Sequence, residues 1–305
     1  MRAVQDPHEL YELTGELPEL GRPVLIQALT GFVDAGNGTQ LARQHLLSAL
    51  EAEPIVTFDI DQLLDYRSRR PVMTFVEDHW ESYDEPSLAL YALRDDAGTP
   101  FLLLAGFEPD LQWNRFTAAM TGLIRRLDIR LTVGLNAIPM AVPHTRPLGV
   151  TAHATRAELI AGHEPWLSRV EVPASVSNLL EYRLGQHGLD AVGFAVHVPH
   201  YLSQTTYPSA AETLLSAVSK ATGLLLPTDA LRSAAEVATA DIDAQIAETE
   251  DAAALVRALE EQHDAFLRGR ESARALPTGS DPLPTADELG AELERFLAEQ
   301  QRPND

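Results

Sequence analysis

The chain has 305 residues, of which 45 are Asp or Glu and 23 are Lys or Arg, so its formal charge is −22. That charge repels phosphate backbones and anionic lipids, which excludes nucleic acids and membrane surfaces as expected partners. Cysteine is absent, which excludes disulfides and Cys-ligated zinc; with no signal-peptide core and no apolar run of about 18 residues, a cytoplasmic protein is expected.

The first half of the chain alternates apolar strands with amphipathic helices. A strand over 24–29 leads through a glycine-rich loop into a helix over 39–50. The pattern then predicts strands over 55–58, 72–76, 88–93 and 101–105, a helix over 113–127 and a strand over 131–135. The turn residues Asp95–Gly98 make the strands on either side of them a hairpin.

The alternation continues with a helix over 175–186, a buried strand over 191–198 and a helix over 209–222. Helices that alternate with fully apolar strands are typical of a parallel sheet covered on both faces. We therefore predict a three-layer α/β/α sandwich with a mainly parallel sheet and one antiparallel hairpin.

Beyond about residue 230 no further strands are predicted. One long amphipathic helix is expected, because apolar residues recur every three or four positions, among them Ile242, Ile246, Val256, Leu259 and Phe266. A Pro- and Gly-containing linker near 275–284 precedes a final helix that begins with a capping pattern at 285–288. The predicted domains are an α/β/α domain over 1–230 and a helical arm over 231–305, whose apolar stripe must pack on its own domain or on another subunit.

Four unusual loops follow predicted strands, at 31–38, 106–110, 136–147 and 199–208. In an open parallel sheet such loops meet at one edge, where ligands bind. The polar side chains that they supply form the predicted ligand pocket: Asp34, Asn37, Glu108, Asp110, His144, Arg146, His200 and Tyr201.

Three of these loops allow a second interpretation. The loop with Asp34 is either an anion site at a helix start or a tight turn, and it matches neither a dinucleotide fingerprint nor a P-loop. His144 and Arg146 suit a phosphate or carboxylate, or else Arg146 pairs with a structural carboxylate. Glu108 and Asp110 are either paired carboxylates for acid–base chemistry or a solvated loop with a helix cap at Asp110.

The sequence assigns no catalytic residue, no metal and no cofactor. No nucleophile elbow is present, and Pro199 keeps His197 and His200 from chelating a metal together. The only locally basic stretch contains Arg67, Arg69 and Arg70, which either form ion pairs or meet a partner.

Several long segments resemble the proteasome assembly chaperone 2 family in its bacterial branch. They include GFVDAGN (31–37) and IPMAVPHTRP (138–147), and further matches cover 58–71, 102–116, 179–202, 207–215 and 256–266. The resemblance implies an α/β/α sandwich similar to nucleoside phosphorylases, used as a binding scaffold in proteasome assembly. Some relatives dock through a hydrophobic-Tyr-any tail, whereas this sequence ends in QRPND over 301–305.

Two functions follow from these observations. The leading hypothesis is a non-enzymatic protein-binding scaffold, expected as a homo-oligomer and with proteasome subunits as candidate partners. The alternative is a small-molecule-binding protein or enzyme of the nucleoside phosphorylase or hydrolase type, in which Asp34, Glu108, His144 and Arg146 converge on a pocket.

Overall fold

The computed structural model describes residues 6–15, 17–163 and 169–275. The chain divides into two compact units, residues 1–260 and 261–305. The final predicted helix and, apart from Ala275, the linker predicted before it lie outside the described residues.

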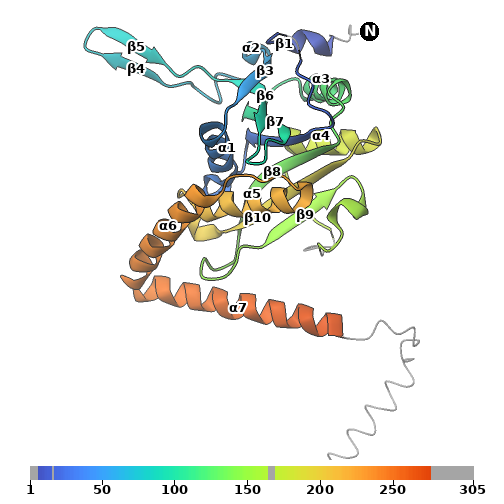
Figure 1. Cartoon of the computed structure of the whole chain (residues 1–305). Coiled ribbons are helices and arrows are strands. Elements are labelled where there is room, and N and C mark those ends of the chain that lie inside the picture. The colour runs from blue at the N-terminus through green and yellow to red at the C-terminus, as the bar shows by residue number, and fades with distance from the viewer. Residues whose placement is uncertain (1–5, 16, 164–168, 276–305) are drawn as a thin grey trace, which may run out of the picture. The chain divides into compact units, whose positions relative to one another are not determined.

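An eight-stranded sheet forms the middle layer, in the order β1, β3, β6, β7, β2, β8, β10 and β9 (Figure 1). Strands β7, β2, β8 and β10 are parallel neighbours, and antiparallel pairs extend the sheet on both sides. This arrangement confirms the predicted fold class, including the hairpin of β6 and β7. The strands are β1 (Tyr11–Leu13), β2 (Val24–Thr30), β3 (Glu53–Phe58), β6 (Leu88–Arg94), β7 (Pro100–Phe107), β8 (Leu131–Met140), β9 (Val150–Ala154) and β10 (Ala191–Pro199).

Helices cover both faces of the sheet. Helices α1 (Gly38–Ala49) and α5 (Pro208–Thr222) pack on one face, and α3 (Trp113–Arg126) and α4 (Val176–Gln186) on the other. This explains why every residue of β10 is buried, since a strand between two helical layers has no face toward water.

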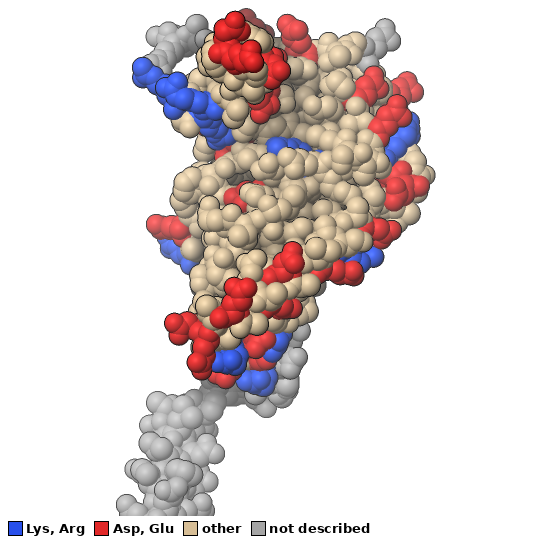
Figure 2. All heavy atoms as spheres, turned by 90° about the vertical axis from the view of Figure 1, so that its left-hand side faces the viewer, with Lys and Arg blue, Asp and Glu red and all other residues tan. Residues whose placement is uncertain are grey.

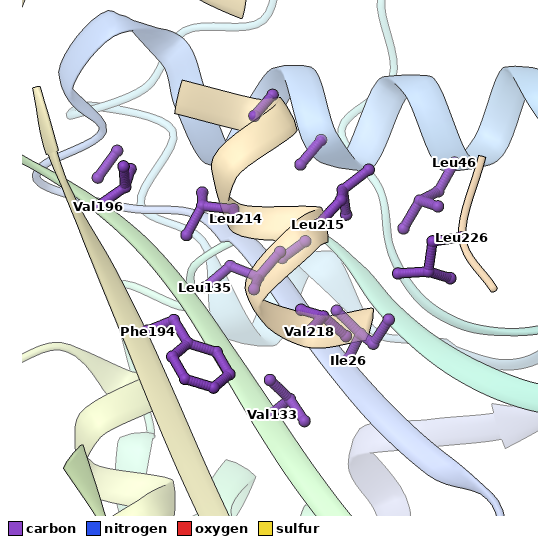
Figure 3. Packing of buried hydrophobic residues seen from close by; sticks show 14 of the residues in the cluster. Ile26, Leu46, Val133, Leu135, Phe194, Val196, Leu214, Leu215, Val218 and Leu226 are labelled. Atoms are coloured by element: carbon purple, nitrogen blue, oxygen red, sulfur yellow. The ribbon is translucent and has the colours of Figure 1, made fainter. Parts of the chain in front are cut away.

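The core on the α5 side is a continuous apolar layer. Leu214, Leu215 and Val218 of α5 lie over Val133 and over other apolar strand side chains (Figure 3). Burial of one such side chain contributes about 1.5–3 kcal/mol, so this layer is a main source of stability.

Local signals set the helix ends. The Ser175 hydroxyl accepts a hydrogen bond from the backbone N–H of Asn178 at 3.1 Å and so caps α4. Helix α5 begins with Pro208 and ends at Gly223, whose φ of 79° is left-handed. The short elements are α2 (Ile60–Leu63) and the 3₁₀ turns η1 (Pro7–Leu10), η2 (Ala35–Asn37), η3 (Ala157–Ile160) and η4 (His200–Leu202).

A second, two-stranded sheet projects from the sandwich between β3 and β6 (Figure 1). It consists of β4 (Met73–Val76) and β5 (His79–Tyr83). Only β4 is predicted by the sequence. All five residues of β5 are exposed, so β5 has no alternation of buried and exposed positions to reveal it.

The single long helix predicted over 242–266 is wrong, because the structure has two helices there. Helix α6 (Asp229–Ala247) ends before Thr249, and α7 (Glu250–Ala275) begins after it. The carbonyl of Thr249 accepts from the N–H of Ala253 at 3.1 Å, as the first bond of α7. Thr is a favoured residue before a helix, and the acidic first turn of α7 complements the helix dipole.

Candidate functional site

Strands β2, β7, β8 and β10 run in the same direction. The four loops that follow them therefore leave the sheet at the same edge. What these loops can do depends on whether their polar side chains face a cavity or contact each other.

The first of these loops uses its own carboxylate where an anion would bind. The Oδ1 and Oδ2 atoms of Asp34 accept from the backbone N–H groups of Thr39 and Gln40, at 2.7 and 2.9 Å. Burial raises the pKa of Asp34, while these bonds and the nearby Arg43 act in the opposite direction. Asn37 adopts a left-handed φ of 55° at the same helix start. The structure thus favours a tight turn over an anion site here.

Glu108 and Asp110 bind different partners. Glu108 is buried, and its Oε1 accepts from the N–H of Val176 at 2.5 Å. Asp110 forms an ion pair with Arg69 at 2.9 Å and accepts from the N–H of Asp65 at 3.0 Å. Asp110 therefore links its own loop to the segment that contains Asp65 and Arg69. The helix cap predicted at Asp110 is not observed.

The buried side chain of His144 is the centre of a hydrogen-bond chain that ends at the exposed Asp243. Its Nδ1 lies 2.6 Å from the Tyr201 hydroxyl, and its Nε2 lies 3.0 Å from Oδ1 of Asp243 in α6. The imidazole is 1% exposed. Burial raises the pKa of Tyr201 to about 12, so the hydroxyl stays protonated and can donate to Nδ1 while Nε2–H donates to Asp243.

Arg146 also contacts the C-terminal helices. It pairs with Glu260 of α7 at 3.0 Å, and the Thr145 hydroxyl donates to the same carboxylate. His200 is exposed and packs edge-on against Tyr201. The loop of residues 136–147 therefore holds α6 and the first part of α7 on this side of the sheet.

The residues of the predicted partner surface are in different environments. Val256 and Leu259 are buried and Ile242 packs on the α5-side core, so these three face inward. Ile246 is half-buried, and Phe266, in the second unit, is 38% exposed. Of the basic stretch, Arg67 and Arg70 are exposed, whereas Arg69 is engaged by Asp110.

A cavity of about 250 Å³ lies where β2, β8 and β10 meet the start of α4. Its polar lining includes Glu108, Asn136, His153, Asn178 and Glu181, and its other walls are mainly apolar. The Nδ1 of His153 and Oε1 of Glu181 are 2.9 Å apart. Of the eight residues predicted for the ligand pocket, Glu108 alone lines this cavity.

Sequence reasoning missed His153 and Glu181, although two glycines marked the place. Gly134 of β8 and Gly193 of β10 are opposite each other in the sheet, and His153 lies over Gly193. A Cβ at Gly193 would come within 2.0 Å of the imidazole. A glycine inside an apolar strand often marks such a close approach.

The projecting hairpin is a second candidate site. Met73, Phe75, Trp80 and Tyr83 are 46%, 55%, 62% and 47% exposed, and Val72 beside them is 67% exposed. Phe75 and Trp80 pack edge-on with ring centroids 5.1 Å apart. Figure 2 shows the side toward which the hairpin points in Figure 1, with acidic side chains and some basic ones around its margin and a mostly uncharged middle.

Within the described ranges, no cluster of three or more His, Asp or Glu side chains is arranged to hold a metal ion. No helix among the described residues is long and apolar enough to cross a membrane.

The fold and these sites define an α/β/α sandwich protein with a projecting aromatic hairpin, in which α6 and the first part of α7 contact the loop after β8. A comparison with protein families matches residues 28–246 to the PAC2 family. The chain therefore belongs to the PAC2 family. Among proteins with curated descriptions, none matches this chain.

Solved structures agree with this assignment. A protein of unknown function from Mycobacterium tuberculosis is 52% identical over 96% of this chain and 97% of its own, with a TM-score of 0.84. One of unknown function from Corynebacterium glutamicum is 40% identical over 85% and 98%, with a TM-score of 0.81. A proteasome-assembly chaperone homologue from M. tuberculosis is 29% identical over 76% and 99%, with a TM-score of 0.70.

Proposed function

We propose that the chain is a non-enzymatic, cytosolic protein-binding scaffold that oligomerises with itself and assists assembly of a proteasome-type complex. The main observation behind the proposal is the hairpin of β4 and β5, which exposes large apolar side chains to solvent. The relationship to a proteasome-assembly chaperone homologue supplies the kind of complex.

Exposure of this kind is costly for a hairpin that has no function in binding. A lone two-stranded sheet is only marginally stable in water, and exposed aromatic side chains mark interaction surfaces. Trp and Tyr are enriched among the residues that dominate binding energy, where truncation of one costs about 2 kcal/mol or more. Phe75 and Trp80, packed on each other, form a preorganised contact of this type.

The surroundings of the hairpin suit a protein partner with basic groups at its rim. Glu77, Asp78 and Glu81 are exposed on the hairpin itself. Charges at the rim of an interface mainly select the partner and speed association. Arg67 and Arg70 are exposed shortly before β4, so a second copy of this chain offers basic side chains as well.

The non-enzymatic part of the proposal rests on how the candidate catalytic groups are bonded. Asp34 caps its own helix, Asp110 pairs with Arg69, and His144 lies between Tyr201 and an aspartate. A general acid or base has to reach a substrate atom, and these groups are engaged by the protein itself.

The test compares wild-type protein with the double variant Phe75→Ser/Trp80→Ser. Light scattering after gel filtration gives the oligomer mass, and affinity capture from the native cytosol with mass spectrometry gives the partners. Wild-type protein is expected to be oligomeric and to retain proteasome α-type subunits, and the double variant to lose both properties.

The matched control is Tyr182→Ser, which removes a side chain that is 62% exposed on α4, outside the hairpin. It should behave as wild type in both assays. A monomeric wild-type protein without any protein partner, or a double variant that is indistinguishable from wild type, would contradict the proposal.

A further inference from the structure

The cavity beside α4 has a chemical character that the scaffold proposal does not use. It lies between Gly134 and Asn136 of β8 on one side and Ser177 and Glu181 of α4 on the other. We propose that this cavity binds a small organic cation, namely a protonated primary amine with a compact apolar body.

The charged side chains that line the cavity favour a cationic ligand. Glu108 and Glu181 supply two carboxyl groups, and no Lys or Arg is present among the described residues that line the cavity. A carboxylate accepts strong, charge-assisted hydrogen bonds from an ammonium group. A phosphate or carboxylate ligand would meet like charge without a compensating cation.

The start of α4 offers little to an anion, although helix starts commonly attract one. The N–H of Val176 already donates to Glu108, and the N–H of Asn178 donates to the Ser175 hydroxyl. Two of the donors that could hold an anion are therefore engaged by the protein. This arrangement also fixes the Glu108 carboxyl group at the cavity wall.

The His153 imidazole is held in place beside the same carboxylates. It contacts Glu181 through Nδ1 and lies over Gly193, where any side chain would overlap it. If Nδ1–H donates to Glu181, the other ring nitrogen, Nε2, is an acceptor. An ammonium group, which only donates hydrogen bonds, is complementary to the Glu181 carboxylate beside this ring.

The apolar walls and the volume of the cavity limit the size and polarity of the rest of the ligand. Leu29, Val33, Ile138, Pro139 and Val172 supply apolar surface. The volume of about 250 Å³ lies just below the range of roughly 300–1,000 Å³ that holds drug-sized ligands. A single aromatic ring or a short branched chain attached to the amine is therefore the expected size.

The test titrates the full-length protein with three probes of nearly equal size in a calorimeter. They are 2-phenylethylamine, its neutral analogue 2-phenylethanol and its anionic analogue phenylacetate. The amine is expected to bind at least tenfold more tightly than the alcohol, because it adds a charge-assisted bond worth about one decade. Phenylacetate is expected to bind more weakly than either.

Two variants locate the site. Glu181→Gln removes one carboxylate and should weaken amine binding about tenfold while changing alcohol binding little. Val33 lines the cavity and is 37% exposed, so Val33→Trp should fill part of the cavity and weaken binding of both amine and alcohol without altering charge. Melting temperatures of both variants show whether the fold is kept.

Because the whole chain is acidic, Glu51→Gln is the matched control, since Glu51 is exposed outside the cavity. It should leave amine affinity unchanged. The proposal is overturned if phenylacetate binds as well as the amine, if no probe binds at millimolar concentration, or if Glu51→Gln weakens amine binding as much as Glu181→Gln does.

Discussion

His197 on β10 should make the stability of the protein depend strongly on pH. Its side chain is buried at 2% exposure, and its Nε2 lies 2.7 Å from the Thr151 hydroxyl. Burial lowers the pKa of His197 to about 4, because a charged imidazole is poorly solvated inside the fold. In the unfolded chain its pKa returns to about 6.5.

The sign and size of the effect follow from these two pKa values. Above pH 6.5 neither state binds a proton at His197, and the full stability is present. Between pH 6.5 and 4 the unfolded chain binds the proton and the folded chain does not, so stability falls as pH falls. A difference of roughly 2.5 pKa units corresponds to about 3 kcal/mol.

The perturbation that isolates this effect is His197→Gln, which removes the titrating ring and keeps a group able to bond to Thr151. Urea unfolding of wild type and variant at intervals from pH 7.5 to 4 gives the free energy of unfolding at each pH. The variant is expected to be less stable at pH 7 by about 1–3 kcal/mol, as a buried bond is perturbed. Toward pH 4 wild type alone loses about 3 kcal/mol, so the deficit of the variant should vanish or reverse.

The matched control is His187→Gln at an exposed histidine, which should follow the wild-type profile. A constant difference between His197→Gln and wild type at every pH would refute the reasoning, because it would mean that His197 takes up its proton alike in both states.

Two further substitutions test contacts in the loop after β8 and within β10. His144→Ala removes the bonds to Tyr201 and Asp243 and should lower the free energy of unfolding by about 2–4 kcal/mol. Because Asp243 belongs to α6, the backbone amides of α6 should also exchange hydrogen faster. Unchanged hydrogen exchange in α6 would contradict this explanation. Gly193→Ala forces the imidazole of His153 aside and should lower the melting temperature by several degrees. The double variant Gly193→Ala/His153→Ala should recover most of that loss, and failure to recover would place the strain elsewhere.

The sandwich could be predicted because its strands and helices have clear local sequence patterns. Between two helical layers, β10 is apolar throughout, and the spacing of Phe116, Met120 and Leu123 places one face of α3 in the core. The edge at which the four loops meet followed from the parallel direction of the strands. These features depend on neighbours within a few positions.

The bonding partner of each loop residue could not be predicted in the same way, because that partner lies far away in the sequence. Asp243 is 99 positions from His144, and Glu260 is 114 from Arg146. The sequence shows that many carboxylates are available but does not show which of them meets His144 or Arg146. The cavity has the same origin, since Glu108 binds a backbone N–H 68 positions away.

The central position of β2 has a consequence for synthesis on the ribosome. This strand, Val24–Thr30, lies between β7 and β8, which end at Phe107 and Met140. At roughly 5–20 residues per second, many seconds pass between the emergence of β2 and that of its second neighbour. During this interval an apolar segment with two unpaired edges is exposed in the nascent chain. Such a chain is expected to need protection by holdase chaperones until β8 has been synthesised.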